Sequence, residues 1–253
     1  MVNVHFSHAN GFPAKTYSFL FEKIEATNIR YINMIGHGEF SLNGDLHNYS
    51  KELINSIERN YKEPIVGIGH SFGGAVTFLA AASRPDLFER VILLDPIIFS
   101  AKKRLAIRLL KNTGLLAHIG PANKTLKRRL HFSSTSEAIT HFSKRKLFNN
   151  FNEHCFQAYV DHGFISSENG IELAFDRKIE AEIFNNPLTK MPKQAQKISG
   201  TLVYGNNSDT FKKEDLHWWR KNMPNFDFVG VDGGHLFPLE HPEVTANIIN
   251  KTK

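Results

Sequence analysis

Short apolar runs alternate with stretches of helical periodicity in the first 95 residues and again near the end of the chain. In the stretches between the runs, apolar residues recur every three or four positions, as they do on one face of a helix. Short continuous apolar runs are typical of strands that are buried on both faces of a parallel sheet. The pattern therefore predicts an α/β fold with a mostly parallel, doubly wound sheet. The predicted strands are residues 2–6, 31–35, 65–68, 91–94, 201–204 and 226–231.

The alternation stops between residues 96 and 197, where the sequence is mainly helical, cationic and rich in phenylalanine. We expect this segment to be a cap inserted after the strand that ends at Asp95, with the core formed by residues 1–95 and 198–253. Within the insert, Asn169-Gly170 predicts a turn in a short hairpin. An insert at this point would lie over the strand ends where open α/β sheets bind ligands.

The sequence Gly69-His70-Ser71-Phe72-Gly73 stands between the strand at residues 65–68 and a long apolar helix. Glycines on both sides of the serine allow the strand and the helix to approach closely, so the turn can expose the hydroxyl group. This is the pattern of a nucleophile elbow, and Ser71 is the candidate nucleophile. An ordinary glycine-rich turn can show the same pattern, so the hypothesis needs partner residues elsewhere in the chain.

A serine hydroxyl needs a general base, and the base needs a carboxylate that fixes its tautomer. His235 follows the last predicted strand in a glycine-rich loop and is the candidate base. Asp209, which follows the strand at residues 201–204, is the preferred acid because of its loop spacing. Asp95 also ends a strand and is the alternative acid.

The other histidines near these loops have simpler interpretations. We expect His8 and His37 to bond loop backbone beneath the site. His70 lies inside the elbow, but we expect its side chain to point away from Ser71 and assign it no role.

With these residues in place, the chain resembles an α/β-hydrolase with a helical cap. The order Ser71, Asp209, His235 is the order of nucleophile, acid and base in that family. The resemblance covers residues 1–95 and about 198–253, and it includes Gly36-His37-Gly38 after the second predicted strand.

The loop His8-Ala9-Asn10-Gly11-Phe12 after the first strand also belongs to the resemblance. It departs from the family at Ala9, where glycine is more usual. The family carries an oxyanion hole of two backbone N–H groups, which the resemblance assigns to Phe72 and Asn10, or to Gly11 if the register shifts by one.

The resemblance implies a carboxylesterase-like serine hydrolase that cleaves an ester or a thioester through an acyl-enzyme. Hydrolysis of a carbon–carbon bond, or a lyase step, on the same three residues is the alternative. A ligand-binding protein without catalysis is a third hypothesis, although a binder needs no nucleophile, base and acid together. A dehalogenase is disfavoured because it would need a carboxylate at position 71.

Length and composition limit the class of protein. A chain of 253 residues that is 41% hydrophobic can bury a sizeable core. No apolar run is long enough to cross a bilayer, and the first residues already form a predicted strand, so we expect a cytoplasmic protein.

Cys155 is the single cysteine, which we interpret as a packed residue. No metal-ligand spacing is present, so we expect neither a metal nor a cofactor. The oligomeric state is left open.

The formal charge is +6, but it is unevenly distributed. Residues 96–136 contain nine Lys or Arg and no Asp or Glu. Three interpretations of this segment remain: solvated helix faces, attraction of an anionic acyl substrate such as a thioester with a phosphate-bearing carrier, and peripheral docking on an acidic lipid surface. We expect no nucleic-acid partner, because no binding motif accompanies the charge.

Overall fold

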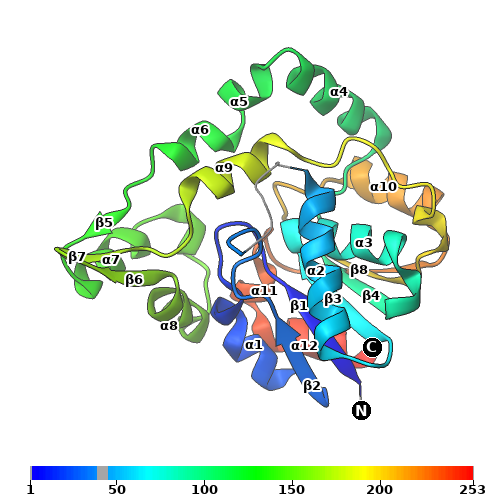
Figure 1. The fold of residues 1–253 in the computed structure, drawn as a ribbon, viewed down its shortest axis with the longest axis horizontal. Coiled ribbons are helices and arrows are strands. Elements are labelled where there is room, and N and C mark those ends of the chain that lie inside the picture. Colours follow the sequence, from blue (N-terminus) through cyan, green and yellow to red (C-terminus); the bar gives the residue numbers. More distant parts are fainter. Residues whose placement is uncertain (1, 39–44, 253) are drawn as a thin grey trace.

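The computed structural model describes residues 2–38 and 45–252. Its centre is a parallel sheet of six strands in the order β2-β1-β3-β4-β8-β9 (Figure 1). The predicted α/β fold class with a mostly parallel sheet is therefore confirmed. The strands are β1 (Asn3–Ser7), β2 (Asn28–Tyr31), β3 (Ile65–His70), β4 (Phe88–Leu94), β8 (Gly200–Gly205) and β9 (Phe226–Val231).

Side chains of the central strands alternate between two apolar clusters because successive residues of a strand point to opposite faces. Ile65 and Leu93 belong to one cluster, whereas Val66 and Ile92 belong to the other. The first cluster includes residues of α2 (Leu46–Asn60), α3 (Phe72–Ser83) and α10 (Lys213–Asn222). The second includes residues of α1 (Ser18–Lys23), α11 (Phe237–Glu240) and α12 (Pro242–Thr252). Helices thus cover both faces of the sheet, as the apolar side chains on both sides of its central strands require.

The strand predicted at residues 31–35 lies earlier, at β2 (Asn28–Tyr31). Ile35 is buried, but its N–H donates to Nε2 of His8, and the N–H of Gly36 donates to the Glu52 carboxylate. Side chains therefore satisfy this backbone in place of a neighbouring strand. An apolar residue in a buried loop gave the same sequence signal as a strand residue.

Residues 96–197 between β4 and β8, called the insert below, contain six α-helices and a small sheet. The sheet is antiparallel, in the order β5-β7-β6, and the expected hairpin is its β6–β7 pair. The chain turns at Glu168 and Asn169, and Gly170, with φ +130°, begins β7. The elements are α4 (Ala101–Asn112), α5 (Leu115–Ile119), α6 (Pro121–Leu126), β5 (His131–Phe132), α7 (Thr135–Ser143), α8 (Glu153–His162), β6 (Phe164–Ser167), β7 (Gly170–Leu173) and α9 (Arg177–Asn185).

Phenylalanines of the insert pack against the core rather than forming a separate hydrophobic centre. Phe142 and Phe148 join the apolar cluster that contains Val66 and Ile92. The ring of Tyr159 lies 5.6 Å from Phe12 of the first loop and 4.9 Å from Phe148. In Figure 1 α4, α5 and α6 extend along the upper edge, away from α8. The insert is thereby anchored at one side of the strand ends and extends over them.

No helix in the described ranges is both long enough and apolar enough to cross a bilayer.

Candidate active site

The turn between β3 and α3 has the tight geometry of a nucleophile elbow. Ser71 has φ +55° and ψ −114°, a backbone conformation that costs a non-glycine residue about 1 to 3 kcal/mol. A Cβ on Gly69 would lie 2.4 Å from the carbonyl oxygen of Gly73. A Cβ on Gly73 would lie 2.1 Å from the carbonyl oxygen of Ser7, at the end of β1. Both glycines are therefore needed for the elbow to close and for the first loop to approach it.

Ser71, His235 and Asp95 form a continuous hydrogen-bonded chain. The Ser71 hydroxyl lies 2.8 Å from His235 Nε2, and His235 Nδ1 lies 2.6 Å from Asp95 Oδ2. Since a carboxylate only accepts, Nδ1 carries the proton and Nε2 is left to accept from the hydroxyl. Asp95 comes directly after β4, and His235 lies in the loop after β9. Strand ends that are distant in sequence thus converge on the elbow.

Asp95 is fully buried and held at both carboxylate oxygens. Oδ1 accepts from the N–H of Gly205 at 2.9 Å, and Oδ2 accepts from the Ser208 hydroxyl at 2.7 Å. The residue has φ +45°, a left-handed conformation that aspartate tolerates better than most side chains. These contacts fix the carboxylate, and through it the plane of the His235 ring.

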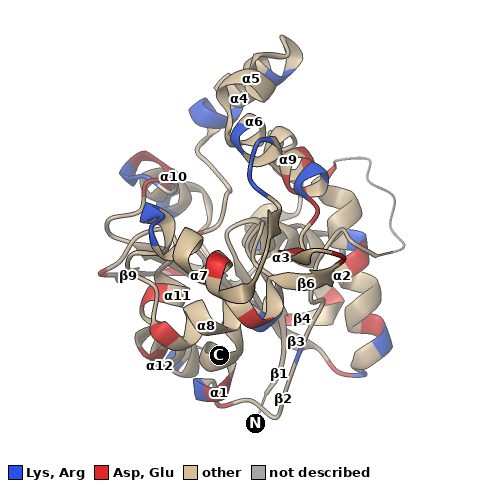
Figure 2. Cartoon of the chain, turned by 90° about the vertical axis from the view of Figure 1, so that its left-hand side faces the viewer, with Lys and Arg blue, Asp and Glu red and all other residues tan. Residues whose placement is uncertain are grey.

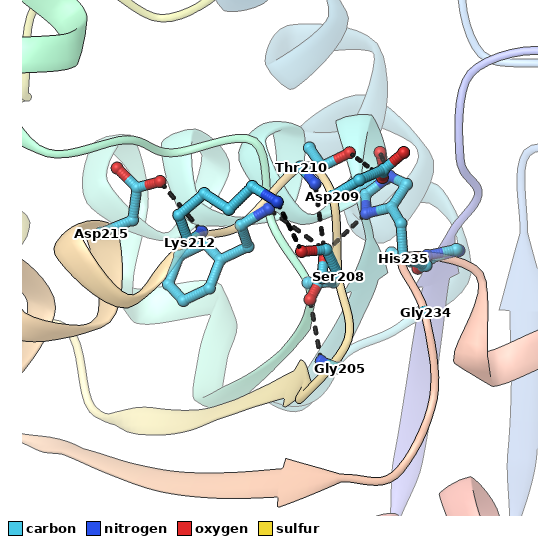
Figure 3. A network of polar contacts seen from close by, with 12 residues as sticks. Gly205, Ser208, Asp209, Thr210, Lys212, Asp215, Gly234 and His235 are labelled. Carbon is cyan, nitrogen blue, oxygen red and sulfur yellow. Dashed lines mark hydrogen bonds and ion pairs between the residues drawn. The ribbon is translucent and has the colours of Figure 1, made fainter.

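The prediction that Asp209 orients His235 is wrong, because Asp95 occupies that position. Asp209 is exposed, and its carboxylate accepts a 3.3 Å bond from the neighbouring Thr210 hydroxyl. The loop after β8 turns at Gly205, whose carbonyl accepts from the N–H of Ser208, so Ser208 is the residue that reaches the buried network. Figure 3 shows this loop beside His235. The sequence spacing correctly placed the loop after β8 at the site. It selected Asp209 from this loop, whereas Ser208 is the residue that contacts the network.

The two backbone groups assigned to the oxyanion hole lie at the cavity that contains Ser71. Phe72 begins α3 and Asn10 lies in the loop after β1. The N–H groups of Phe72, Asn10 and Gly11 make no hydrogen bond to another described residue. The side chain of Asn10 donates to the carbonyl oxygen of Glu180 on α9, which ties the loop to the insert. These residues therefore bring N–H donors without a described partner to the cavity that Ser71 lines.

His8 and His37 bond loop backbone, as expected. His8 donates from Nδ1 to the carbonyl oxygen of Ala9 at 2.8 Å and accepts at Nε2 from the N–H of Ile35 at 2.8 Å. Nε2 of His37 accepts from the N–H of Asp176 at 2.9 Å, which joins its loop to the insert.

His70 does not point away from the site, contrary to expectation. Its Nε2 donates to the backbone carbonyl of His235 at 2.9 Å, and its Nδ1 accepts from the Tyr17 hydroxyl at 2.7 Å. The oxygen of that hydroxyl in turn accepts from the N–H of Ala9 at 3.3 Å. His70 and Tyr17 therefore connect the loop of His235 to the loop of Asn10. The only sequence signal was the position of His70 inside the elbow.

Burial of three neutral histidines predicts a loss of stability in acid. Desolvation lowers the pKa of His70 to about 3, of His5 to about 3 and of His8 to about 4; the nearby charge of His235 also lowers that of His70. Unfolded histidine binds a proton near pH 6.5, so folding must exclude that proton at lower pH. The free energy of unfolding should therefore be highest above pH 6.5. Between pH 6.5 and pH 5, each buried histidine should lower it by about 2 kcal/mol.

Denaturant titrations across this pH range measure the effect. His5→Gln, which changes a residue of β1 that bonds Ser56 rather than the Ser71 network, should reduce the slope of unfolding free energy against pH by about 1.4 kcal/mol per unit. An unfolding free energy that stays constant from pH 6.5 to pH 5 would contradict the burial of these rings in neutral form.

A cavity of about 1000 Å³ opens above Ser71 between the core and the insert. Its wall is mainly apolar and includes Phe12, Ile97, Ile107, Phe142 and Phe148. Five basic side chains and one carboxylate also line it: Lys124, Lys127, Arg128, Arg129, Arg145 and Glu180.

The charged groups of the cavity differ in whether they are neutralised. Arg128 forms a two-pronged ion pair with the buried Glu180, and Arg129 pairs with Glu137. Within the described part of the chain, Lys124 and Lys127 have no carboxylate partner. Arg145 contacts His141 instead of an acid. The cavity therefore combines an apolar interior with a wall of net positive charge. Across the described residues, no group of three or more His, Cys, Asp or Glu side chains is arranged to hold a metal ion.

The model of the alpha/beta hydrolase family matches residues 6–248. Rat monoglyceride lipase is 37% identical over 90 residues, which are 30% of this chain and 30% of the lipase. A type I acyl-CoA thioesterase of Penicillium brevicompactum is 31% identical over 111 residues, 36% of this chain and 25% of that protein. The matches thus span less than a third of these relatives' own length.

The crystal structure of E-2-(acetamidomethylene)succinate hydrolase superposes with a TM-score of 0.78 at 17% identity. The superposition covers 99% of this chain and 90% of the hydrolase. At that identity the likeness supports the fold alone.

Proposed function

Because this chain belongs to the alpha/beta hydrolase family, we propose that it is a serine hydrolase that cleaves a carboxylic ester or thioester. Ser71 is the nucleophile, His235 the general base and acid, and Asp95 the carboxylate that orients His235. The observation that carries the proposal is the chain of short hydrogen bonds from Ser71 through His235 to Asp95 at the wall of a large cavity. Relatives named as a lipase and a thioesterase support this reaction class.

The first half of the reaction forms an acyl-enzyme. The Ser71 oxygen attacks the substrate carbonyl carbon while its proton passes to His235 Nε2. The imidazolium that results keeps its Nδ1–H bond to Asp95, which stabilises the positive charge. The carbonyl oxygen becomes an oxyanion, which the N–H groups of Phe72 and Asn10 would bind. One such donor typically contributes about 10²- to 10³-fold to the rate.

The second half releases the acid. The alcohol or thiol leaves with the proton from Nε2, and a water molecule takes its place. His235 then removes a proton from this water as it attacks the acyl-enzyme, and the proton returns to Ser71 when the carboxylic acid departs. In this proposal the insert, residues 96–197, acts as the cap that shields both steps.

The apolar cavity would hold the acyl group, and its basic wall favours an acyl group that carries a negative charge. Lys124, Lys127 and Arg145 lack carboxylate partners among the described residues, so a substrate carboxylate or phosphate would neutralise them. A unit charge about 4 Å from one cation in water gains about 1 kcal/mol. The electrostatic contribution therefore raises selectivity by about fivefold per contact.

A matched pair of p-nitrophenyl esters tests both parts of the proposal. We expect turnover of p-nitrophenyl nonanoate, and a kcat/KM about fivefold higher for the mono-p-nitrophenyl ester of nonanedioic acid, which adds a terminal carboxylate to the same chain. The double variant Lys127→Glu, Arg145→Glu should reverse this preference. Salt at about 0.5 M should reduce it in the unsubstituted protein, because exposed charges are screened.

The outcomes separate the two parts. Equal kcat/KM for both esters would contradict the preference for an anionic acyl group but would support ester hydrolysis. No turnover of either ester, or of short-chain esters and acyl thioesters, would contradict ester hydrolysis. That result would favour the alternative of carbon–carbon bond cleavage or a lyase step on the same residues.

A further inference from the structure

Helix α4 is attached to the core by its polar side chains. Arg104 is buried, donates to the carbonyl oxygen of Phe99, and places its guanidinium 4.4 Å from the Trp218 ring. Lys103 bonds the carbonyl oxygen of Thr210 at 3.0 Å and forms an ion pair with Asp215. The inward side of α4 therefore carries these two cations beside the partly buried Ile107 and Leu110, so polar contacts replace part of the usual apolar face.

Large apolar side chains also occupy the outward face. Leu105 and Leu109, one helical turn apart on α4, are 48% and 58% exposed. Leu115 and Ile119, one turn apart on α5, are 50% and 67% exposed. Single exposed leucines are common, but four in two consecutive helices form a patch. In Figures 1 and 2 α4 and α5 lie at the upper edge of the molecule.

Positive charge surrounds this patch. Lys102 and Arg108 are exposed on α4 beside the leucines and make no ion pair with a described residue. Residues 96–136 contain no acidic side chain, and Figure 2 shows basic but no acidic colour along α4, α5 and α6. The same face on a second copy would therefore bring like charges together, which disfavours self-association. A negatively charged partner complements it.

We propose that the outer face of α4 and α5 binds an anionic lipid surface. The outer face is defined by Leu105, Leu109, Leu115, Ile119, Lys102 and Arg108. The apolar side chains enter the region between headgroups and acyl chains, while the cations contact anionic headgroups. An exposed row of leucines flanked by lysine and arginine is the composition that such interfacial helices use.

The outer face lies close to the cavity through the same two helices. Ile107, on the side of α4 opposite Leu105 and Leu109, lines the cavity above Ser71, and so does Leu116 of α5. A lipid surface bound at the outer face would therefore lie against the wall of the cavity. The docking itself does not depend on the reaction that Ser71 performs.

Sedimentation of the full chain with lipid vesicles tests the proposal. We expect binding to phosphatidylcholine vesicles that contain about 30% phosphatidylglycerol, much weaker binding to pure phosphatidylcholine, and loss of binding at about 0.5 M salt. The double variant Leu109→Ser, Ile119→Ser should lower the partition coefficient at least about tenfold. Lys102→Glu with Arg108→Glu should abolish the preference for anionic vesicles.

A matched control variant is available in Ile165→Ser, Val244→Ser. These residues are 51% and 49% exposed but lie outside the outer face, so their replacement should leave vesicle binding unchanged. Circular dichroism and thermal melting confirm that each variant is folded. Leu109 and Ile119 do not line the cavity. The rate of p-nitrophenyl acetate hydrolysis should therefore be the same in the unsubstituted protein, in Leu109→Ser, Ile119→Ser and in the control variant.

Three results would overturn the proposal. The first is equal binding to neutral and anionic vesicles, or to neither. The second is an equal loss of binding in the control variant. The third is a dimer in solution that Leu109→Ser, Ile119→Ser dissociates without any vesicle binding, which would make the outer face an interface between copies. A protein that binds vesicles but hydrolyses no ester would retain this inference and lose the proposed function.

Discussion

Replacement of Asp95 by asparagine should lower kcat/KM for ester hydrolysis by about 10⁴-fold. The Asp95 carboxylate accepts the Nδ1 proton of His235 at 2.6 Å. An asparagine amide that turns its NH₂ group toward Nδ1 would favour the other tautomer, whose Nε2 carries a proton and cannot accept one from Ser71. The left-handed backbone at position 95 tolerates asparagine, so the substitution changes the chemistry more than the fold. Steady-state kinetics with a p-nitrophenyl ester measures the loss.

The matched control is Asp209→Asn. Asp209 is exposed and bonds its neighbour Thr210, so its replacement should change kcat/KM by less than about twofold. Thermal melting of both variants separates a kinetic loss from unfolding, since Gly205 and Ser208 also bond Asp95. Retained activity in Asp95→Asn together with a large loss in Asp209→Asn would contradict the geometry and restore Asp209 as the acid.

Replacement of Ser71 by alanine should lower kcat by about 10⁵- to 10⁶-fold. The substitution removes the oxygen that lies 2.8 Å from His235 Nε2 and so removes the atom that would form the acyl-enzyme. His235→Ala should lower kcat by a similar factor. Because the two residues act as a unit, the double variant should be no slower than either single variant. Single-turnover assays at high enzyme concentration reach the required sensitivity.

Ser208→Ala is the control for loss of a hydroxyl group in the same network. The Ser208 hydroxyl bonds Asp95 and does not contact Ser71, so its removal should lower kcat only by about 10- to 100-fold. An equal loss in Ser71→Ala and Ser208→Ala would argue that both act by disturbing the site rather than through a nucleophile. A kcat of Ser71→Ala within tenfold of the unsubstituted protein would exclude Ser71 as the nucleophile.

The sheet and the elbow could be predicted from the sequence because their signals are local. A strand buried on both faces is mostly apolar, and a turn as tight as that of Ser71 needs Gly69 and Gly73. The convergence of Ser71 and His235 followed from their positions after the carboxyl ends of two strands, β3 and β9, of one parallel sheet. These parts of the structure depend on residue type and chain order alone.

The choice between the two candidate acids could not be made in this way. Asp95 and Asp209 both follow buried strands, so spacing does not distinguish them. The acid is determined by which side chain of the loop after β8 points into the site. Ser208 points inward, whereas Asp209 points outward. That direction depends on hydrogen bonds between β4 and the loop, which are more than 100 positions apart in sequence.

The role of His70 was missed for a related reason. Its partners, Tyr17 and the carbonyl group of His235, are 53 and 165 positions away, and no local pattern connects them. The packing of α4 was missed as well. Arg104 of this helix is buried, whereas Leu105 and Leu109 are exposed. The contacts that hold Arg104 inward come from Phe99 and Trp218, which lie outside the helix.

Intact-protein mass spectrometry after treatment with a fluorophosphonate tests the central claim most directly, because this reagent forms a stable bond with an activated serine. The account predicts one adduct on the unsubstituted protein, located on the peptide that contains Ser71. It predicts none on Ser71→Ala and strongly slowed labelling of Asp95→Asn, but normal labelling of Asp209→Asn. An adduct of equal yield on Ser71→Ala, or no adduct on the unsubstituted protein, would contradict the account.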